Sequence, residues 1–116
     1  MIVNTLDSYA CAIKSLDGPI LVQFGSPSCV KCGPFSKCIS DLSNSYQFGH
    51  IYISTPDAPE LVEEFEVARL PAFALLQNGN DEEKHVVQSA DVETLTTAIS
   101  GGCQRKLPKL ELDADF

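Results

Sequence analysis

An almost continuous apolar run near the N-terminus, Ile20-Leu21-Val22-Gln23-Phe24, is the feature that most constrains how this chain can fold. A strand of this composition is typically buried on both faces, as a central strand of a parallel sheet is. Both faces of such a sheet must be covered, and helices are the usual cover. The run therefore predicts an α/β domain.

Helical and strand-like segments alternate along the rest of the chain. Helices are expected over 9–16, 29–42 and 58–65, and strands over 20–24, 51–54, 72–76 and 84–88. A last helix is expected to start at Ser89 and to end at Gly101-Gly102. Asp7 or Ser8 is the expected cap of the first helix, and Asp57 is the expected cap of the helix over 58–65.

The connections between these segments determine the expected topology. Alternation up to the strand 72–76 implies parallel crossovers, whereas Asn78-Gly79 predicts a hairpin that brings 84–88 back antiparallel. Val92, Leu95 and Ile99 recur at helical spacing, so they form the buried face of the last helix. The sequence therefore predicts a mixed sheet with helices on both faces, formed by residues 1–103 and followed by a tail over 104–116.

Length and charge exclude several classes of function. The 116 residues form one domain, and the longest apolar stretches, such as 19–22 and 70–76, are too short to span a bilayer. The net charge of −8 argues against nucleic acid as a partner, because phosphate binding requires clustered Lys and Arg. The glutamates within 60–66 are interpreted as a solvated helix face, with a docking patch for a basic partner as the alternative.

The N-terminus and the cysteine count indicate the compartment. The first residues contain no basic region followed by an apolar core, so we expect no secretory signal and a cytosolic protein. Five cysteines is an odd number, and a structural disulfide framework is not expected in the cytosol. Cys11, Cys38 and Cys103 are interpreted as small apolar residues, with Cys103 the most exposed, and His50 and His85 as surface residues.

The remaining cysteines, Cys29 and Cys32, lie where the strand 20–24 leads into a helix. Cys29 is expected in the first turn of that helix, where unsatisfied N–H groups, the helix dipole and Lys31 favour a thiolate. Cys32 lies one turn further on, close enough to attack a mixed disulfide formed at Cys29. Zinc is the alternative, but structural zinc needs four ligands and the other cysteines and histidines are not paired at ligand spacing.

Three segments in this order resemble the thioredoxin family, from about residue 7 to residue 101. The strand ending at Phe24 precedes Cys29 by five residues, Leu70-Pro71-Ala72-Phe73 resembles the cis-proline segment, and 75–79 resembles the hairpin after it. The resemblance implies a thioredoxin fold in which Cys29 attacks and Cys32 resolves. It also implies a cis Leu70–Pro71 bond facing the pair, with the Leu70 backbone binding an extended substrate peptide. A plain proline at a strand start is the alternative for Pro71.

Several positions depart from the family pattern. Gln23 stands where most thioredoxins have a buried Asp, so proton transfer from Cys32 is expected to be slower or to use water or another base. Val30 and Lys31 replace Gly-Pro between the cysteines and are expected to shift the redox potential. Gln88 replaces a small residue beside the substrate groove, which is expected to narrow specificity.

The residues around the pair allow a second alignment. Cys32-Gly33-Pro34-Phe35 looks like the family's Cys-Gly-Pro-Cys with the second cysteine lost, which describes a one-cysteine or inactive relative. The spacing from Phe24 favours Cys29 as the first cysteine. Gly25 and Ser28 also stand where the family has tryptophans, and the chain contains no Trp.

The resemblance leads to two functional hypotheses. In the first, the chain is a monomeric reductase of protein disulfides that needs no metal or organic cofactor. A thioredoxin-reductase-like or glutathione-linked electron donor recharges it. In the second, the fold is a binding or regulatory module whose redox activity is incidental, a hypothesis motivated by the missing carboxylate and tryptophans. An isomerase or oxidase needs an exported location, which the N-terminus does not support.

Overall fold

The computed structural model describes residues 2–16, 18–76, 86–88 and 91–105. Within these residues the elements, in chain order, are α1 (Leu6–Ser15), β1 (Ile20–Gly25), α2 (Cys32–Ser43), β2 (Tyr46–Gln47), β3 (Gly49–Ser54), the 3-10 turn η1 (Thr55–Asp57), α3 (Pro59–Phe65), β4 (Ala72–Leu76), β5 (Val86–Val87), α4 (Val92–Gly102) and β6 (Gln104–Arg105). Each helix and strand predicted from the sequence has a counterpart here, although several of their ends differ. No helix in the described part of the chain is long and apolar enough to cross a membrane.

The main sheet has the strand order β3-β1-β4-β5, so β1 occupies a central position. Every residue of β1 is buried, as the apolar run predicts. β1 pairs parallel with β3 and antiparallel with β4, and β4 pairs antiparallel with β5. The mixed sheet and the antiparallel return of 86–87 are therefore confirmed, while the turn at Asn78-Gly79 lies outside the described residues.

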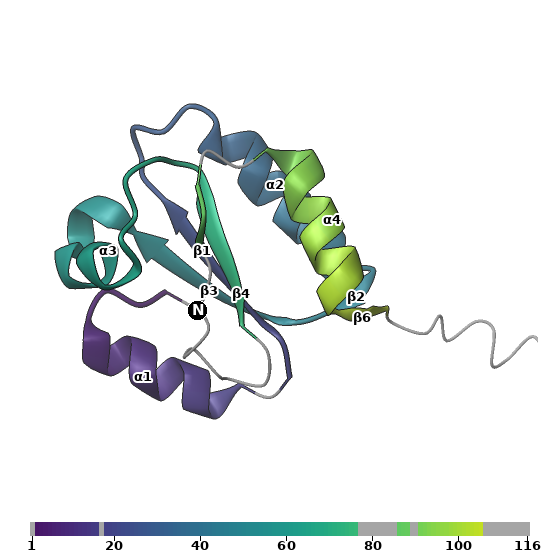
Figure 1. Cartoon of the computed structure of the whole chain (residues 1–116), viewed down its shortest axis with the longest axis horizontal. Coiled ribbons are helices and arrows are strands. Elements are labelled where there is room, and N and C mark those ends of the chain that lie inside the picture. The colour runs from purple at the N-terminus through teal and green to yellow at the C-terminus, as the bar shows by residue number, and fades with distance from the viewer. Residues whose placement is uncertain (1, 17, 77–85, 89–90, 106–116) are drawn as a thin grey trace, which may run out of the picture.

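Helices cover both faces of this sheet (Figure 1). α1 and α3 lie on one face, where Ile20, Val22 and Phe24 of β1 point into a shared core. α2 and α4 lie on the other face, over Leu21 of β1 and Phe73 of β4. Since side chains alternate along a strand, Gln23 lies on the same face as Leu21, beneath α2.

The direction of β4 differs from the prediction. It was expected to follow a parallel crossover, but Ala72 pairs with Phe24 and Leu76 pairs with Ile20, so β4 is antiparallel to β1. A parallel crossover must carry the chain back along a whole strand, which is about 20 Å for a strand as long as β3. The connection over 55–71 contains η1 and the seven-residue α3, and it returns the chain to the sheet at the end where β3 leaves it, so no such crossover is made. This places Leu70 and Pro71 at the end of the sheet where β1 leads into α2.

The predicted helix caps are partly wrong. Thr5 caps α1: its Oγ1 accepts from the Ser8 N–H at 3.0 Å while Ser8 Oγ accepts from the Thr5 N–H at 3.1 Å. α3 has no side-chain cap: Asp57 belongs to η1, and Pro59 at the start of the helix has no N–H that would need an acceptor. Asp91 caps α4 through the Thr94 N–H at 2.8 Å.

The end of α4 also differs from the prediction. Gly101-Gly102 belongs to the helix, which Cys103 ends in an extended conformation. Leu95 and Ile99 are fully buried as predicted, whereas Val92 remains 44% exposed. Gln104–Arg105 then pairs with Tyr46–Gln47 in a second, two-stranded sheet that the sequence analysis did not predict. The boundary between domain and tail at 103/104 stays a prediction, and residues 106–116 lie outside the described part.

Candidate active site

The loop between β1 and α2 carries Cys29. The Cys29 N–H donates to the Ser26 carbonyl at 3.0 Å, and the Cys32 N–H donates to the Cys29 carbonyl at 3.3 Å. These turns lead into α2, which begins at Cys32 and not at Cys29 as predicted. Pro34 explains the difference, because inside a helix its ring collides with the carbonyl four residues earlier. The helix therefore starts just before Pro34, and Cys29 precedes its N-terminus.

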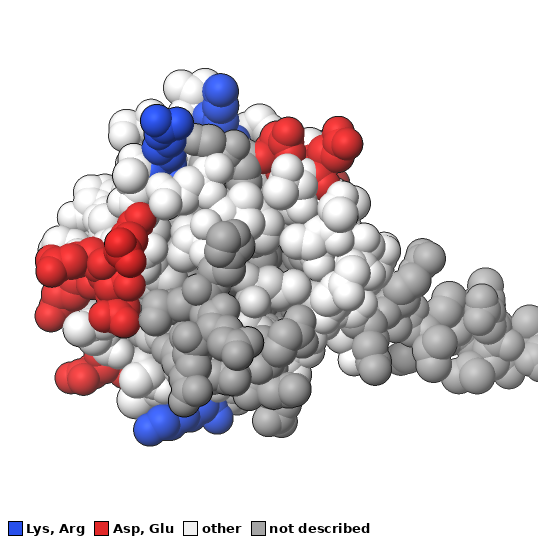
Figure 2. Space-filling model, in the orientation of Figure 1, with Lys and Arg blue, Asp and Glu red and all other residues white. Residues whose placement is uncertain are grey.

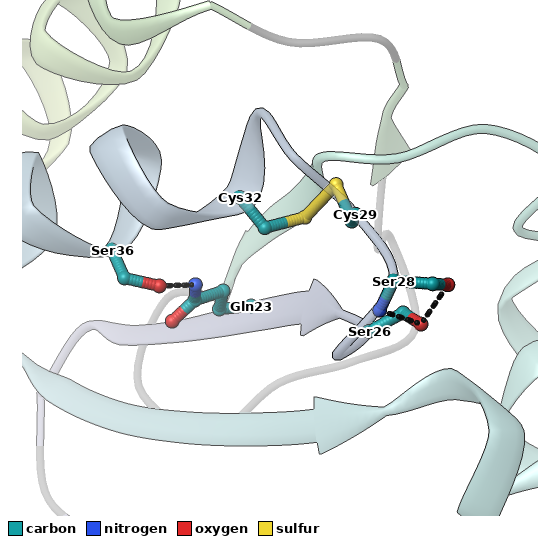
Figure 3. The surroundings of a disulfide bond; sticks show 6 residues. All are labelled: Gln23, Ser26, Ser28, Cys29, Cys32 and Ser36. Atoms are coloured by element: carbon teal, nitrogen blue, oxygen red, sulfur yellow. Dashed lines mark hydrogen bonds between the residues drawn. A yellow bond between two sulfur atoms is a disulfide. The ribbon is translucent and has the colours of Figure 1, made fainter.

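A disulfide joins Cys29 and Cys32, whose Cα atoms are 5.4 Å apart (Figure 3). Cys32 is only 7% exposed, whereas Cys29 is partly exposed on the loop. The two sulfurs therefore differ in accessibility: an incoming disulfide reaches Cys29 more easily than Cys32. In the shifted alignment Phe35 takes the place of the second cysteine, but its ring lies in the core against Phe73.

The dipeptide between the cysteines faces outward. Val30 is 90% exposed and Lys31 is also exposed, so neither side chain packs against the core. They can act on the pair through charge, through contact with an incoming substrate, or through both. Their predicted effect on the redox potential stays a prediction.

Gln23 projects from β1 beneath the first turns of α2 and is only 1% exposed. Its amide nitrogen donates to Ser36 Oγ at 2.7 Å, one turn of helix after Cys32 (Figure 3). Its Oε1 lies 2.8 Å from His50 Nε2 on β3. An amide oxygen can only accept, so the His50 ring donates from Nε2. A buried amide thus links α2 to β3 on the side of the disulfide that faces the sheet.

His50 is not the ordinary surface residue that the sequence analysis assumed. It is partly buried, and this burial lowers the pKa of its imidazole below 6.5. The signal was present in the sequence, since Ile51 and Ile53 alternate with His50 and Tyr52. If the isoleucines face one core, His50 must lie on the opposite face, which is the face of Gln23.

Within the described residues, the Gln23 side chain bonds to a hydroxyl and an imidazole and to no carboxylate. Neither the Gln23 amide nor the Ser36 hydroxyl accepts a proton near neutral pH, so neither can act as a general base there. The titratable group of the network is the imidazole of His50. Among the described residues, no three His, Cys, Asp or Glu side chains gather closely enough to hold a metal ion.

Leu70 and Pro71 form one wall of a groove of about 500 Å³ beside the start of α2. The Leu70–Pro71 bond is cis, as predicted. Lys31, Pro34 and Phe35 form the wall on the α2 side. Asp91 and Val92 close the groove at the start of α4, so its lining is mainly apolar with one charge of each sign.

The predictions for the other cysteines were only partly correct. Cys11 is exposed on α1, so Cys11 and not Cys103 is the most exposed of the three. Cys38 is partly buried between α2 and α4, with its Sγ 3.7 Å from Thr96 Oγ1. Cys103 is also partly buried, and burial raises the pKa of its thiol. All three are free thiols, whereas His85 lies outside the described residues.

Surface charge is unevenly distributed (Figure 2). Acidic side chains gather over α3, where Glu60, Glu63, Glu64 and Glu66 are all exposed, as a solvated helix face requires.

At Gly25, the absence of a side chain leaves room for a neighbour, since a Cβ there would lie 2.8 Å from the Tyr52 hydroxyl oxygen. A tyrosine of β3 therefore covers a position where the sequence analysis noted a missing tryptophan.

Comparison with known proteins identifies the family of this site. The family model described as Thioredoxin matches residues 1–101, which include the cysteine pair and the cis-proline segment. The chain belongs to the thioredoxin family. Members of this family exchange thiols and disulfides through a cysteine pair, which is the chemistry that the Cys29–Cys32 disulfide can perform.

Curated thioredoxins of plants are similar to this chain. The chain is 27% identical over 90 residues to the chloroplastic M-type thioredoxin of Zea mays, a match covering 75% of this chain and 53% of the relative. It is 28% identical over 86 residues to the chloroplastic thioredoxin M5 of Oryza sativa subsp. japonica, covering 72% and 49%. The chain thus spans about half the length of the curated relatives it matches.

Solved thioredoxin structures share the fold. The Plasmodium falciparum thioredoxin superposes with a TM-score of 0.77 at 21% identity, covering 90% of this chain and 87% of that one. The oxidised mitochondrial thioredoxin 3 of Saccharomyces cerevisiae has a TM-score of 0.74 at 17% identity, covering 87% and 93%. At these identities the likeness establishes the thioredoxin fold, as predicted from the sequence.

Proposed function

We propose that this chain is a thiol–disulfide oxidoreductase that reduces protein disulfides through Cys29 and Cys32. The observation that carries the proposal is the disulfide between a partly exposed and a buried cysteine at the start of α2. The positive end of the helix stabilises negative charge on a sulfur that precedes it, which favours a thiolate at Cys29. Val30 and Lys31 then form the dipeptide of a Cys-Val-Lys-Cys active site.

The proposed cycle has two exchange steps. The Cys29 thiolate attacks one sulfur of the substrate disulfide, forming a mixed disulfide and releasing the other substrate sulfur as a thiolate, which takes up a proton. The Cys32 thiol loses its proton and attacks Cys29 Sγ, which forms the Cys29–Cys32 disulfide and releases the second substrate thiol. The substrate has gained two electrons and two protons, and the pair must be reduced again by a dithiol or two thiols.

The groove beside the pair suits an extended peptide. Leu70 lies on its wall next to Pro71, at the edge where a substrate chain can add to exposed backbone groups. The apolar lining from Pro34, Phe35 and Val92 favours apolar residues next to the substrate cysteine.

Reduction of insulin by dithiothreitol tests the assignment. Wild type is expected to accelerate precipitation of the reduced insulin chains, whereas Cys29→Ser is expected to match the reaction without protein. Cys11→Ser is the matched control, because Cys11 is exposed on α1 and outside the pair. Equal rates for wild type and Cys29→Ser would show that the catalytic assignment is wrong.

A binding module is the second candidate function. Gln23 in place of a carboxylate motivates it, since the base expected to assist Cys32 is absent. A pair potential far too oxidising for the glutathione pool, together with stable partner complexes of a Cys29→Ser/Cys32→Ser variant, would favour this function. A potential at the reducing end of the thioredoxin range would favour the reductase.

The proposed reductase needs an electron donor as a partner. We expect a monomer that receives electrons from a thioredoxin-reductase-like or glutathione-linked donor. Measuring turnover with each donor system separates the two, and light scattering of the oxidised and reduced protein tests the monomer. Neither a nucleic acid nor a membrane is an expected partner.

We propose the cytosol as the location. The free thiols of Cys11, Cys38 and Cys103 suit a reducing compartment, where such thiols persist. The names of the curated plant relatives place those proteins in the chloroplast, which is the alternative. Imaging of the tagged full-length protein in its own host distinguishes the two locations, and a plastid signal overturns the proposal.

A further inference from the structure

One side chain from a distant part of the sequence holds the loop that precedes Pro71. The Oε1 of Gln88 accepts from the Ala68 N–H at 2.6 Å and from the Arg69 N–H at 3.0 Å. Its Nε2 donates to the Glu66 carbonyl oxygen at 3.1 Å. A single amide therefore bonds three backbone groups of the segment 66–69, two as acceptor and one as donor.

The hydrogen bonds of Gln88 continue those that α3 makes to the start of this segment. Residues 66–71 belong to no helix or strand; the N–H groups of Glu66 and Val67 donate to the Glu63 and Val62 carbonyls of α3, whereas those of Ala68 and Arg69 lie beyond the reach of the helix. The segment begins at Glu66, whose φ of 54° is the left-handed conformation in which helices commonly end, here at the C-terminus of α3. Gln88 supplies partners to the N–H groups that follow, just before Leu70.

The sheet brings Gln88 to this loop. Val86 pairs with Ala74 and Val87 with Phe73. Continuing this antiparallel register by one residue places Gln88 beside Ala72, the residue that follows Pro71. The amide therefore reaches across the start of β4 to the chain that enters it.

The segment that Gln88 binds leads directly into the groove. Leu70 and Pro71, on one wall, continue the segment 66–69 that Gln88 binds. Asp91 and Val92, on another wall, start α4 shortly after Gln88. The hydrogen bonds of Gln88 thus tie the connection before β4 to the connection after β5.

We propose that Gln88 is a positioning residue for substrate binding, which holds the backbone before Pro71 in the conformation that pairs with an extended peptide disulfide. The inference rests on the proposed reductase function. If only a fraction of free molecules has the competent loop conformation, the apparent affinity for the peptide falls by that fraction. A small disulfide attacked directly at Cys29 needs no such backbone pairing, so its rate is insensitive to the loop.

Steady-state kinetics of Gln88→Ala on two substrates tests the proposal. With a disulfide-bonded peptide, the variant is expected to raise KM by about fivefold to tenfold with kcat nearly unchanged, as the loss of such hydrogen bonds allows. With bis(2-hydroxyethyl) disulfide, its kcat/KM is expected to stay within about twofold of wild type. Gln88→Glu keeps an acceptor for the Ala68 and Arg69 N–H groups but loses the donor to the Glu66 carbonyl, so it is expected to restore part of the peptide affinity. Gln47→Ala, an exposed glutamine of β2, is the matched control and is expected to behave as wild type.

Amide hydrogen exchange gives a second readout. In Gln88→Ala, the N–H groups of Ala68 and Arg69 are expected to exchange faster, while those of β1 keep their protection. Unchanged peptide KM in Gln88→Ala, or an equal loss of rate on both substrates, would overturn the positioning role while the reductase function stands. Wild type that reduces neither substrate would instead refute the proposed function itself.

Discussion

Replacing Gln23 by methionine tests whether the buried amide network stabilises the oxidised protein. Methionine has a similar length and volume, so Gln23→Met removes the polar atoms without opening a large cavity. It removes the bond to Ser36 Oγ at 2.7 Å and the bond from His50 Nε2 at 2.8 Å. Ser36 is exposed and can bind water instead, but His50 is partly buried and loses a partner that water replaces poorly.

These contacts define the expected size of the effect. Each hydrogen bond contributes about 0.5–1.5 kcal/mol net, and burying an apolar thioether offsets part of the loss. We expect Gln23→Met to lower the free energy of unfolding by about 1–2 kcal/mol. For a domain of this size, that corresponds to a fall in Tm of about 5–10 °C.

A double-mutant cycle isolates the bond between Gln23 and His50. Urea unfolding of the oxidised protein is measured for wild type, Gln23→Met, His50→Leu and the double variant. Because the double variant leaves no polar group without its partner at this contact, we expect a coupling of about 1 kcal/mol between the two sites. If the losses in free energy of unfolding of the two single variants add within about 0.3 kcal/mol in the double variant, the bond between Gln23 and His50 does not stabilise the fold.

Three further predictions concern neighbouring features. Because burial lowers the pKa of His50 in the folded state, the unfolded chain binds this proton more readily, so stability should fall as pH drops from 6.5 through the lowered pKa and stay level above 6.5. Urea unfolding across this range should give a flatter profile for His50→Gln, and equal slopes would contradict the assignment. Leu95 is fully buried, so Leu95→Ala should cost about 2–5 kcal/mol in urea unfolding, and a loss below about 1 kcal/mol would mean that α4 is not packed as described. At Gly25 a Cβ would meet the Tyr52 hydroxyl oxygen at 2.8 Å, so Gly25→Ala should lower the free energy of unfolding by about 1–2 kcal/mol in wild type but much less in a Tyr52→Leu background. Equal losses in the two backgrounds would show that the tyrosine is not the obstacle.

Features set by local sequence were predicted well. The apolar composition of β1 was enough to predict that the strand is buried, and the spacing of Cys29 and Cys32 was enough to predict that these two thiols can pair. The start of α2 at Cys32 differs from the predicted start at Cys29 although it is also local, because Pro34 is sterically compatible only with the first turn of a helix.

Features set by the pairing of distant segments were harder to predict. The bond between Gln23 and His50 depends on the parallel alignment of β1 and β3, which places Leu21 opposite His50. The direction of β4 depends on how the whole connection over 55–71 packs, because a connection of this length can lead to either direction. The contacts of Gln88 depend on both, so the sequence suggested its place beside the groove but not which backbone groups it binds.

The two parts of the proposed active site differ in how far apart their residues lie along the chain. Cys29 and Cys32 are three residues apart in the sequence, so they can come together in a nascent or partly unfolded chain. Leu70 and Pro71 reach the pair only after the chain has passed through β3 and α3 and β4 has paired with β1, which closes a long loop. In the proposed reductase, the cysteine pair is thus a local feature of the chain, whereas the groove proposed for the substrate peptide requires the pairing of β4 with β1.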